Sequence, residues 1–267
     1  MNYLVIKCGG SIFEQLSPSF FEELVQIQKE KEFVPIIVHG GGPSITKTLS
    51  SLEIETKFVN GLRQTTPEVL DVVEMILSGS LNKQIVRNII KAGGKAIGIS
   101  GVDGMFLEAK PVQNADEIGL VGEITNVRTE IVKMITDMDG IPVISPIAVD
   151  LFGQHYNINA DLAAAAIAKS LEGTICLVTN VAGVLVDGEV QSSLSNKQVE
   201  QLIESQQITG GMIPKVHSAI DCLENGVSNV VIIDGTTKQS LTRFTKGEHS
   251  GTFFYLEEEM IYSGHNS

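Results

Sequence analysis

The sequence has no long hydrophobic run and no excess of basic residues. No apolar stretch in the 267 residues approaches the roughly 18 that a membrane-spanning helix needs. The opening "MNYLVIKCGG" is too short, and broken too early, for a secretory signal peptide, so we expect a cytoplasmic protein. Nineteen basic against 32 acidic residues give a formal net charge of −13, which argues against nucleic acid and anionic membranes as general partners.

Cysteine is scarce and has no metal-binding spacing. The three cysteines are Cys8, Cys176 and Cys222, and two of them end or lie within apolar runs. We therefore expect buried free thiols in a reducing compartment rather than a redox or metal role.

The best-known nucleotide and catalytic motifs are missing as well. The sequence contains no G-x-G-x-x-G, no Gly-Lys-Ser or Gly-Lys-Thr phosphate loop and no protein-kinase signature. It has no G-x-S-x-G elbow, and its five histidines form no H-E-x-x-H or similar pattern. Acyl hydrolysis and zinc chemistry therefore have no support, and we expect no dedicated metal site.

What the sequence does contain is a set of short apolar runs rich in valine and isoleucine. Continuous rather than alternating apolarity favours strands buried on both faces, as in a parallel sheet. The predicted strands are 3–8, 34–39, 95–100, 141–147, 174–179 and 229–234. Between them, helical spacing with start and stop signals predicts helices over 17–31, 67–92, 161–173 and 214–226.

Alternating strands and helices predict an α/β fold, a layered sandwich with helices on both faces of an open, mainly parallel sheet. Short pieces at 56–63 and 103–128 are typical of β-hairpins, which we expect to decorate one end of that sheet. No linker-like or low-complexity segment divides the chain, so we expect one domain over 1–267. A soft boundary near 145–175 separates an N-terminal from a C-terminal half.

Glycine-bearing turns follow several predicted strands, where ligands of open α/β sheets bind. The most conspicuous lies in "FVPIIVHGGGPS" (33–44), in which an apolar strand runs into three consecutive glycines. The others are Gly9 with Gly10, "GISGVDG" (98–104) and "TNVAGVL" (179–185), and a further pair, Gly210 and Gly211, opens the "GGMIPK" helix. One such turn is weak support for a ligand, but several at one edge reinforce each other.

Two lysines and an acidic stretch are candidates for chemistry. Lys7 lies inside the first apolar strand, where a charge is costly to bury unless it snorkels or meets an anion. Lys215 lies near the first turn of a helix, where a cation opposes the dipole, although it could simply be a solvated surface lysine. Asn157 and Asp161 lie at the entrance to an alanine-rich helix, for which Asn159 or Asp161 could serve merely as the N-cap.

Taken together, these residues resemble the acetylglutamate branch of the amino acid kinase family. The opening "KCGGS" and the "GGM…K" element are shared by the wider family, whereas "VHGGGP" followed by "NGLRQT" points to this branch. The matching segments occur in family order along almost the whole chain: 6–11, 38–43, 60–83, 98–104, 142–150, 156–161, 178–185 and 210–216.

The resemblance implies an open α/β/α sandwich that uses ATP to phosphorylate the γ-carboxylate of N-acetyl-L-glutamate, the second step of arginine biosynthesis. An N-terminal lobe, about 1–170, would bind the acyl-amino acid, and a C-terminal lobe, about 171–267, would bind ATP. Mg²⁺ would be held mainly by nucleotide oxygens and water. Because the accepting carboxylate is already ionised at neutral pH, no general base is needed, which fits the missing catalytic histidine.

The resemblance also implies roles for individual residues. Lys7 and Lys215 would be the transition-state cations, with Asp161 holding both in place. Arg63 suits a planar, bidentate contact with the α-carboxylate of the substrate. The substrate ligands would be Gly41, Gly42, Arg63 and Asn157. Backbone N–H groups of Gly9 and Gly10 would hold phosphate oxygens, and the adenine side would be lined near Thr179, Asn180, Gly183, Gly210 and Gly211.

One departure from the family concerns assembly. Arginine-inhibited members carry an extra N-terminal helix that links dimers into a hexameric ring, whereas only Met1 and Asn2 precede the first predicted strand here. We therefore expect a homodimer that is insensitive to arginine feedback, with the 67–92 helix as a candidate interface.

Two other interpretations stay open. A sister kinase of the same family could act on another amino acid or acyl-amino acid, because side-chain length discrimination is not readable from the sequence. The chain could also be a non-catalytic ligand-binding module on this fold, although the presence of Lys7, Asp161 and Lys215 argues against it. Without the resemblance, the residues indicate an α/β protein that binds a phosphorylated anion, with an NAD-type oxidoreductase as the competitor.

Overall fold

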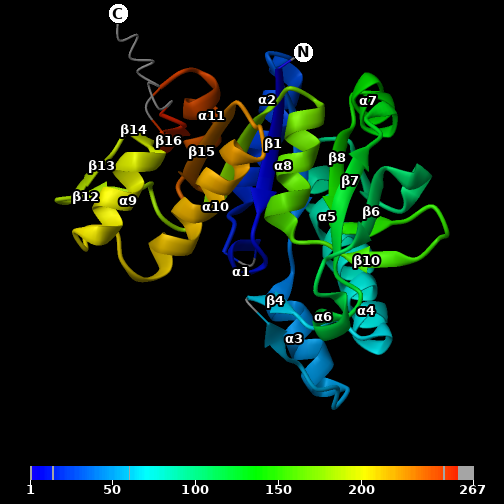
Figure 1. The fold of residues 1–267 in the computed structure, drawn as a ribbon. Coiled ribbons are helices and arrows are strands. Elements are labelled where there is room, and N and C mark those ends of the chain that lie inside the picture. Colours follow the sequence, from blue (N-terminus) through cyan, green and yellow to red (C-terminus); the bar gives the residue numbers. More distant parts are fainter. Residues whose placement is uncertain (1, 14, 60, 249, 258–267) are drawn as a thin grey trace, which may run out of the picture.

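A computed structural model describes residues 2–13, 15–59, 61–248 and 250–257. Its central sheet contains β1 (Asn2–Cys8), β2 (Phe33–His39), β5 (Ala96–Ser100), β8 (Ile141–Ser145), β11 (Thr174–Thr179), β14 (Ser193–Ser195), β15 (Asn229–Asp234) and β16 (Thr252–Tyr255). The strand order is β14-β16-β15-β11-β1-β2-β8-β5 (Figure 1). Neighbouring strands are parallel except β15 and β16, so the predicted open, mainly parallel sheet is confirmed.

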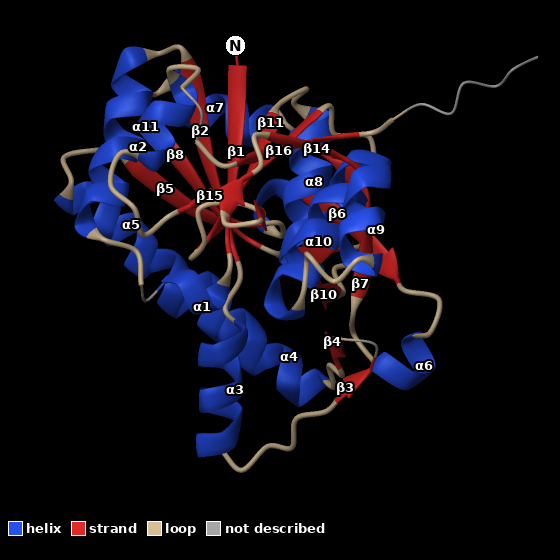
Figure 2. Cartoon of the chain, turned by 90° about the vertical axis from the view of Figure 1, so that its left-hand side faces the viewer, coloured by secondary structure: helices blue, strands red, loops and turns tan. Residues whose placement is uncertain are grey.

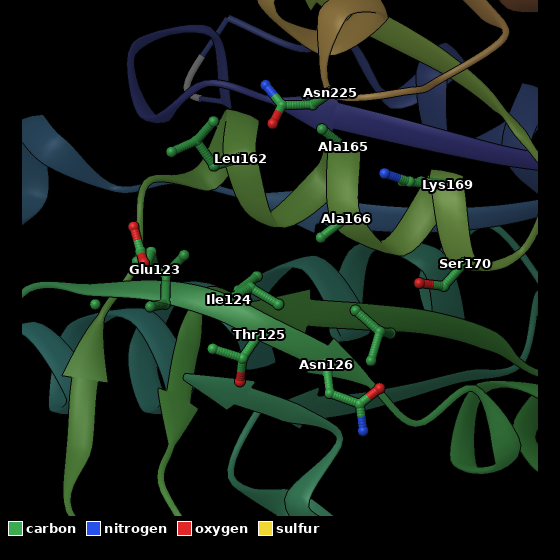
Figure 3. A pocket seen from close by; sticks show the side chains of 13 residues that line it. Glu123, Ile124, Thr125, Asn126, Leu162, Ala165, Ala166, Lys169, Ser170 and Asn225 are labelled. Carbon is green, nitrogen blue, oxygen red and sulfur yellow. The ribbon is translucent and has the colours of Figure 1, made fainter. Parts of the chain in front are cut away.

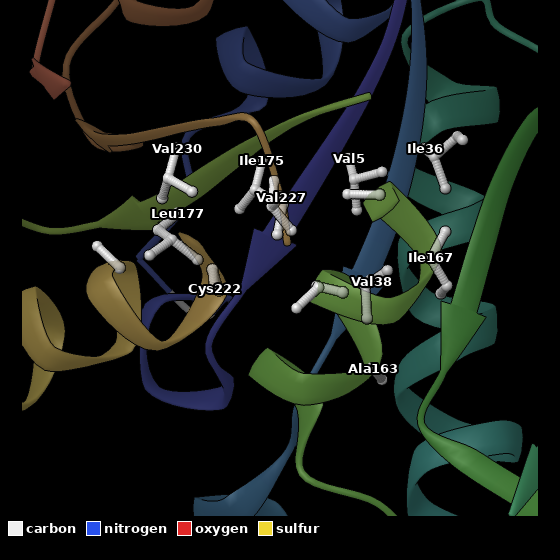
Figure 4. Close-up of a cluster of buried hydrophobic side chains, with 14 of the residues drawn as sticks. Val5, Ile36, Val38, Ala163, Ile167, Ile175, Leu177, Cys222, Val227 and Val230 are labelled. Carbon is white, nitrogen blue, oxygen red and sulfur yellow. The ribbon is translucent and has the colours of Figure 1, made fainter. Parts of the chain in front are cut away.

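Helices cover both faces of this sheet. On one face lie α2 (Pro18–Glu30), α5 (Asn82–Lys91) and α11 (Ser240–Thr245), and on the other lie α8 (Ala160–Ser170) and α10 (Ile213–Glu224) (Figure 2). Each face has its own hydrophobic cluster, and in the one beneath α8 and α10, Val5 and Val38 of the sheet meet Ile167 (Figure 4). The central strands are therefore buried from both sides, which explains their continuous apolar runs.

A second sheet lies beside the first and combines β6 (Leu107–Pro111), β7 (Gly122–Val127), β9 (Ile147–Val149) and β10 (His155–Asn157) in the order β10-β9-β6-β7. The hairpin predicted at 103–128 is present as the antiparallel pair β6 and β7. The strand predicted over 141–147 was wrong in extent, because it ends at Ser145 and the chain re-enters the second sheet at Ile147. Pro146 separates the two strands, since proline offers no N–H to continue a ladder.

The predicted 67–92 helix is present as three consecutive segments, α4 (Pro67–Glu74), the π-helix η1 (Met75–Leu81) and α5. π-helical turns are rare and frequently occur at functional sites. The remaining helices are α1 (Gly10–Phe13), α3 (Gly42–Ser51), η2 (Asp103–Met105), α6 (Ala115–Ile118), α7 (Glu130–Asp137), α9 (Asn196–Glu204) and η3 (Gly210–Met212). Two small hairpins complete the described chain: β3 (Phe58–Val59) with β4 (Leu62–Arg63), as predicted at 56–63, and β12 (Leu185–Val186) with β13 (Glu189–Val190).

Helix starts and glycine positions differ in places from the sequence predictions. Ser17 occupies the N-cap position of α2, but its hydroxyl makes no capping bond and instead lies 2.5 Å from the Ser19 hydroxyl. Gly98 lies inside β5 and not in a turn. Gly210 and Gly211 form the 3₁₀ turn η3, and α10 itself begins at Ile213.

Two further sequence expectations can be compared with the structure. All three cysteines are buried free thiols, as predicted. None of the described helices is both long enough and apolar enough to cross a membrane.

Candidate active site

The carboxyl end of β1 carries an ion pair between two of the predicted catalytic residues, Lys7 and Asp161. The Nζ of Lys7 lies 2.8 Å from the Oδ1 of Asp161, and the two side chains are 18% and 29% exposed. Asp161 is free for this contact because Asn159 is the N-cap of α8, accepting hydrogen bonds from the N–H groups of Asp161 and Leu162. The capping alternative for Asp161 is thus excluded, and the ammonium of Lys7 lies over Gly9, 3.9 Å from where a Cβ would be.

The turns after β1 and β2 approach each other so closely that only glycine fits. A Cβ at position 10 would lie 2.7 Å from the Cα of Gly41, and one at position 41 would lie 2.5 Å and 2.7 Å from carbons of Leu81 and Leu77. Gly42 has open space around it. In the described part of the chain, the N–H groups of Gly41 and Gly42 have no protein acceptor. Two free backbone donors at a strand end, at the start of α3, suit an anionic ligand.

Arg63, on β4, places a buried guanidinium beside this glycine loop. Its Nη2 donates to the hydroxyl of Thr46, at 2.8 Å, and to the carbonyl of Gly42, at 3.3 Å, and its Cζ lies 4.8 Å from the centre of the Phe58 ring. Its Nη1 is buried and has no hydrogen-bond partner among the described residues. Burial lowers the pKa of this guanidinium. A buried, unpaired cationic donor is costly, and a carboxylate ligand would remove that cost.

Asn157, on β10, is joined to Arg63 through a residue that the sequence did not point to. The Nδ2 of Asn157 donates to the Thr65 hydroxyl at 3.2 Å, and that hydroxyl donates to the carbonyl of Arg63 at 2.9 Å. Thr65 is completely buried. Nothing in a single threonine within "RQTTPE" indicates this role, because the contact crosses 92 residues of sequence.

The C-terminal half contributes Lys215, which the structure places differently from the prediction. Its Nζ donates to the Oδ1 of Asn180 at 3.2 Å, whereas Asp161 has its described ion pair with Lys7 alone. Burial lowers the pKa of Lys215, and the nearby charge of Asp234 opposes that shift. Asp161 therefore does not hold both lysines in this structure. The contact does join Lys215 to the start of the loop after β11. Thr179, the last residue of β11, and Asn180 were predicted to line the nucleotide side.

Asp234, the last residue of β15, is a second residue that the sequence analysis missed, and it is charged. Burial raises its pKa, but hydrogen bonds from the hydroxyls and N–H groups of Thr236 and Thr237 outweigh that effect and leave the pKa below its ordinary value. Asp234 and Ala182 line a cavity of about 380 Å³ next to the 180–184 loop. Gly183 packs into this region with a φ of +147°, and a Cβ there would lie 2.6 Å from the Thr252 hydroxyl. The signal available was the position of an aspartate as the last residue of a buried strand.

The hollow between β7 and α8 is separate from these residues. It has a volume of about 560 Å³, and its charged lining groups are Glu123 and Lys169 (Figure 3). None of the predicted site residues lines it. The candidate active site is therefore the strand edge carrying Lys7 and the glycine turns.

The fold and this edge define an α/β protein with a site for anionic ligands at the carboxyl ends of parallel strands. The sequence profile described as the Amino acid kinase family matches residues 2–234, and the chain belongs to that family.

Two individual relatives are acetylglutamate kinases. The chain is 45% identical over 256 residues to an acetylglutamate kinase from Oceanobacillus iheyensis, covering 94% of this chain and 96% of that protein. It is 48% identical over 237 residues to one from Geobacillus thermodenitrificans, covering 88% and 91%.

Solved structures agree on the fold. A crystal structure of smu.665 from Streptococcus mutans matches with a TM-score of 0.79 and 30% identity, covering 94% of this chain and 98% of that one. A Neisseria gonorrhoeae N-acetylglutamate synthase, complexed with coenzyme A and N-acetyl-glutamate, matches with a TM-score of 0.78 at 20% identity. The match covers 96% of this chain and 60% of the synthase and, at this identity, supports the fold alone.

Proposed function

We propose that this chain is an acetylglutamate kinase, which transfers the γ-phosphoryl group of ATP to the γ-carboxylate of N-acetyl-L-glutamate and forms N-acetyl-L-glutamyl 5-phosphate and ADP. This reaction is the second step of arginine biosynthesis. The observation that carries the proposal is the unpartnered Nη1 of Arg63 beside the free N–H groups of Gly41 and Gly42. The relatives of 45% and 48% identity support the same activity.

The acceptor is held by the N-terminal half. Arg63 offers Nη1 to its α-carboxylate, while Nη2 stays anchored on Thr46 and keeps the guanidinium plane fixed. Gly41 and Gly42 offer backbone N–H groups, and Asn157 offers its amide from the side of the second sheet. Such donors orient an acyl-amino acid without supplying a base.

No base is required, because the accepting γ-carboxylate has an ordinary pKa of about 4.3 and is ionised at neutral pH. One carboxylate oxygen attacks the γ-phosphorus, the bond to the β,γ-bridging oxygen breaks, and ADP leaves with that electron pair. The main obstacle is charge, since two unit charges 4 Å apart repel by about 4 kcal/mol at an effective dielectric of 20. Lys7 and Lys215 oppose this repulsion, and Asp161 fixes the ammonium of Lys7.

ATP is held between the turn after β1 and the C-terminal half. Backbone N–H groups of Gly9 and Gly10 bind phosphate oxygens, and the adenine side is lined by Thr179, Asn180, Gly183, Gly210 and Gly211. Within the described residues, no three histidine, cysteine or acidic side chains gather in a way that would hold a metal ion. Asp161 is also engaged by Lys7. Mg²⁺ would enter as part of the MgATP substrate, coordinated mainly by phosphate oxygens and water.

The test is a coupled assay for ADP release with purified protein and MgATP. ADP release should depend on N-acetyl-L-glutamate and be far slower with glutamate or aspartate. A preference for glutamate or aspartate would identify a sister kinase. ADP release that no acyl-amino acid stimulates would contradict the proposal, and failure to bind MgATP at all would favour a non-catalytic module.

The same proposal assigns the two substrates to different parts of the chain. Arg63 and Asn157 belong to an acceptor lobe, about 1–170, and Asn180 and Lys215 to an ATP lobe, about 171–267, of one domain. The three buried free thiols suit the reducing cytoplasm.

We further propose a homodimer that uses the 67–92 helix together with the edge of the central sheet. Met75, Ile90 and Ile97 are 54%, 55% and 38% exposed, and Ile97 lies on β5, the outermost strand. An exposed apolar edge strand favours pairing with another chain. Light scattering should give a dimer for the wild type and a monomer for Ile97→Lys; a wild-type monomer would contradict the proposal.

A further inference from the structure

His39, the last residue of β2, directly precedes the acceptor loop and is almost completely buried, at 1% exposure. Its Nδ1 lies 3.2 Å from the carbonyl oxygen of Gly40, and its Nε2 lies 3.3 Å from the Nδ2 of Asn82. The phosphoryl transfer proposed above uses no histidine. A buried imidazole whose two nitrogens are both engaged therefore needs another explanation.

The amide orientation of Asn82 follows from two independent partners. The ammonium of Lys83 donates to the Oδ1 of Asn82 at 2.9 Å, and the Nδ2 of Asn82 donates to the carbonyl of Val143 at 2.8 Å. Because an ammonium can only donate and a carbonyl can only accept, the amide nitrogen must be the atom that faces His39.

The orientation of Asn82 in turn fixes the histidine tautomer. The Asn82 nitrogen also lies 3.4 Å from the Ile99 carbonyl, which competes for its second hydrogen. Because an amide nitrogen donates and does not accept, Nε2 of His39 faces a donor and is the ring nitrogen without a proton. Burial lowers the pKa of His39 to about 4, only partly opposed by the bond to Gly40, so the ring is neutral near pH 7 with its single proton on Nδ1. That proton is donated to the Gly40 carbonyl.

We propose that His39 is a positioning residue that holds the Gly40–Gly41 peptide so that the Gly41 N–H faces the acceptor. The inference rests on the proposed function. The described peptide bonds are all trans, and in a planar trans peptide the carbonyl and the following N–H point in opposite directions. A Gly40 carbonyl drawn toward the buried imidazole therefore turns the N–H of Gly41 away from it, and this N–H has no acceptor among the described residues.

The same hydrogen bonds explain why residue 98, inside β5, is a glycine, although the proposed chemistry does not use it. A Cβ at position 98 would overlap the Oδ1 of Asn82 and lie 2.7 Å from the Nζ of Lys83. Lys83 also donates to the Gly98 carbonyl at 2.9 Å. Glycine at this position thus leaves room for the Lys83–Asn82–His39 chain of hydrogen bonds.

The variants that test the proposal separate the two ring nitrogens. His39→Asn keeps an amide donor near the position of Nδ1, whereas His39→Gln places its amide near Nε2 and loses the donor to Gly40. We expect His39→Gln to raise the KM for N-acetyl-L-glutamate by about tenfold, the usual effect of losing one hydrogen bond. The KM for ATP should not change, and His39→Asn should recover most of the loss.

A matched control and a direct measurement complete the design. Ser78→Ala removes a hydrogen bond between η1, which directly precedes α5, and Ser145, and should leave both KM values unchanged. Nitrogen-15 NMR of the wild type, with the His39 signals assigned from their loss in His39→Gln, should show a neutral ring protonated on Nδ1.

Three outcomes would overturn the proposal: a wild-type ring protonated on Nε2, an unchanged acceptor KM in His39→Gln, or an equal rise in the KM for ATP. The NMR result does not depend on turnover, and the signal assignment requires only that the His39→Gln protein be folded. A wild type inactive with N-acetyl-L-glutamate would instead refute the proposed function. The His39 tautomer could still be measured and would show whether the ring donates to the Gly40 carbonyl.

Discussion

Replacing Arg63 by lysine tests the acceptor site most directly, because it keeps the charge and removes the planar fork. The two terminal nitrogens of the guanidinium differ in their partners. Nη2 donates to Thr46 and Gly42, whereas Nη1 has no partner among the described residues and can donate to the ligand. A lysine ammonium cannot occupy both positions and also loses the stacking on Phe58. At least one charge-assisted hydrogen bond to the substrate is lost, worth about 1.5–3 kcal/mol. A tenfold change corresponds to about 1.4 kcal/mol, so the KM for N-acetyl-L-glutamate should rise about 10- to 150-fold.

The assay is steady-state ADP release with each substrate varied in turn, accompanied by thermal melting. Because the proposed ATP site lies on other residues, the KM for ATP should stay near the wild-type value, and the split between the two constants is the diagnostic result. An unchanged acceptor KM in a folded Arg63→Lys protein would refute the assignment of Arg63. Equal increases in both constants would indicate a general structural defect instead.

The other predictions concern transfer, packing and pH. Lys7→Ala and Lys215→Ala should each lower kcat by at least about 10²-fold with an unchanged melting curve, as for loss of a charge-stabilising donor; surviving turnover would contradict the mechanism. Gly41→Ala forces a Cβ to 2.5 Å from a leucine of η1 and should cost about 1–3 kcal/mol in urea unfolding, whereas Gly79→Ala, with open space around it, should cost nothing. The pKa of Asp234 is lowered on folding, so its contribution to stability is present at neutral pH and is lost as pH falls through the folded pKa. Asp234→Asn should therefore be less stable than wild type at pH 7 and equal to it in strong acid; equal stability at pH 7 would contradict this.

Elements defined by local patterns were predictable from the sequence. The central strands follow from continuous apolar runs, and the predicted helices appear close to their expected bounds because proline, caps and glycine mark their ends. Short strands such as β10 and β14 were not predictable, because three residues carry no periodicity and their pairing depends on distant partners. The π-helix inside the 67–92 helix has no sequence signal of this kind either.

The sequence indicated candidate residues for the site, but not the contacts that these residues make. The family resemblance pointed to Lys7, Asp161 and Arg63, and the structure brings Lys7 and Asp161 into an ion pair across 154 positions of sequence (161 minus 7). The partner of Lys215 is Asn180 rather than Asp161, which depends on how the loop after β11 meets α10. Thr65 could not be anticipated, since its importance comes from bridging Arg63 and Asn157, which meet only in the folded chain.

The three glycines of "HGGGP" differ in their surroundings. At Gly40 a Cβ would lie 3.6 Å from the Gly10 nitrogen and 3.7 Å from the Ala160 methyl, which are ordinary contacts, so packing does not exclude a side chain there. At Gly41 a Cβ would lie 2.5 Å and 2.7 Å from carbons of Leu81 and Leu77, so the leucines of η1 would have to move. Gly42 meets nothing within 4 Å, so packing does not require it. Gly42 is at the start of α3 and has no side chain. A ligand carboxylate can therefore come close to its backbone N–H from the open side. The loop thus combines a closely packed residue, Gly41, with a residue that has open space around it, Gly42. An acceptor carboxylate that is held by backbone donors next to a lysine needs this arrangement.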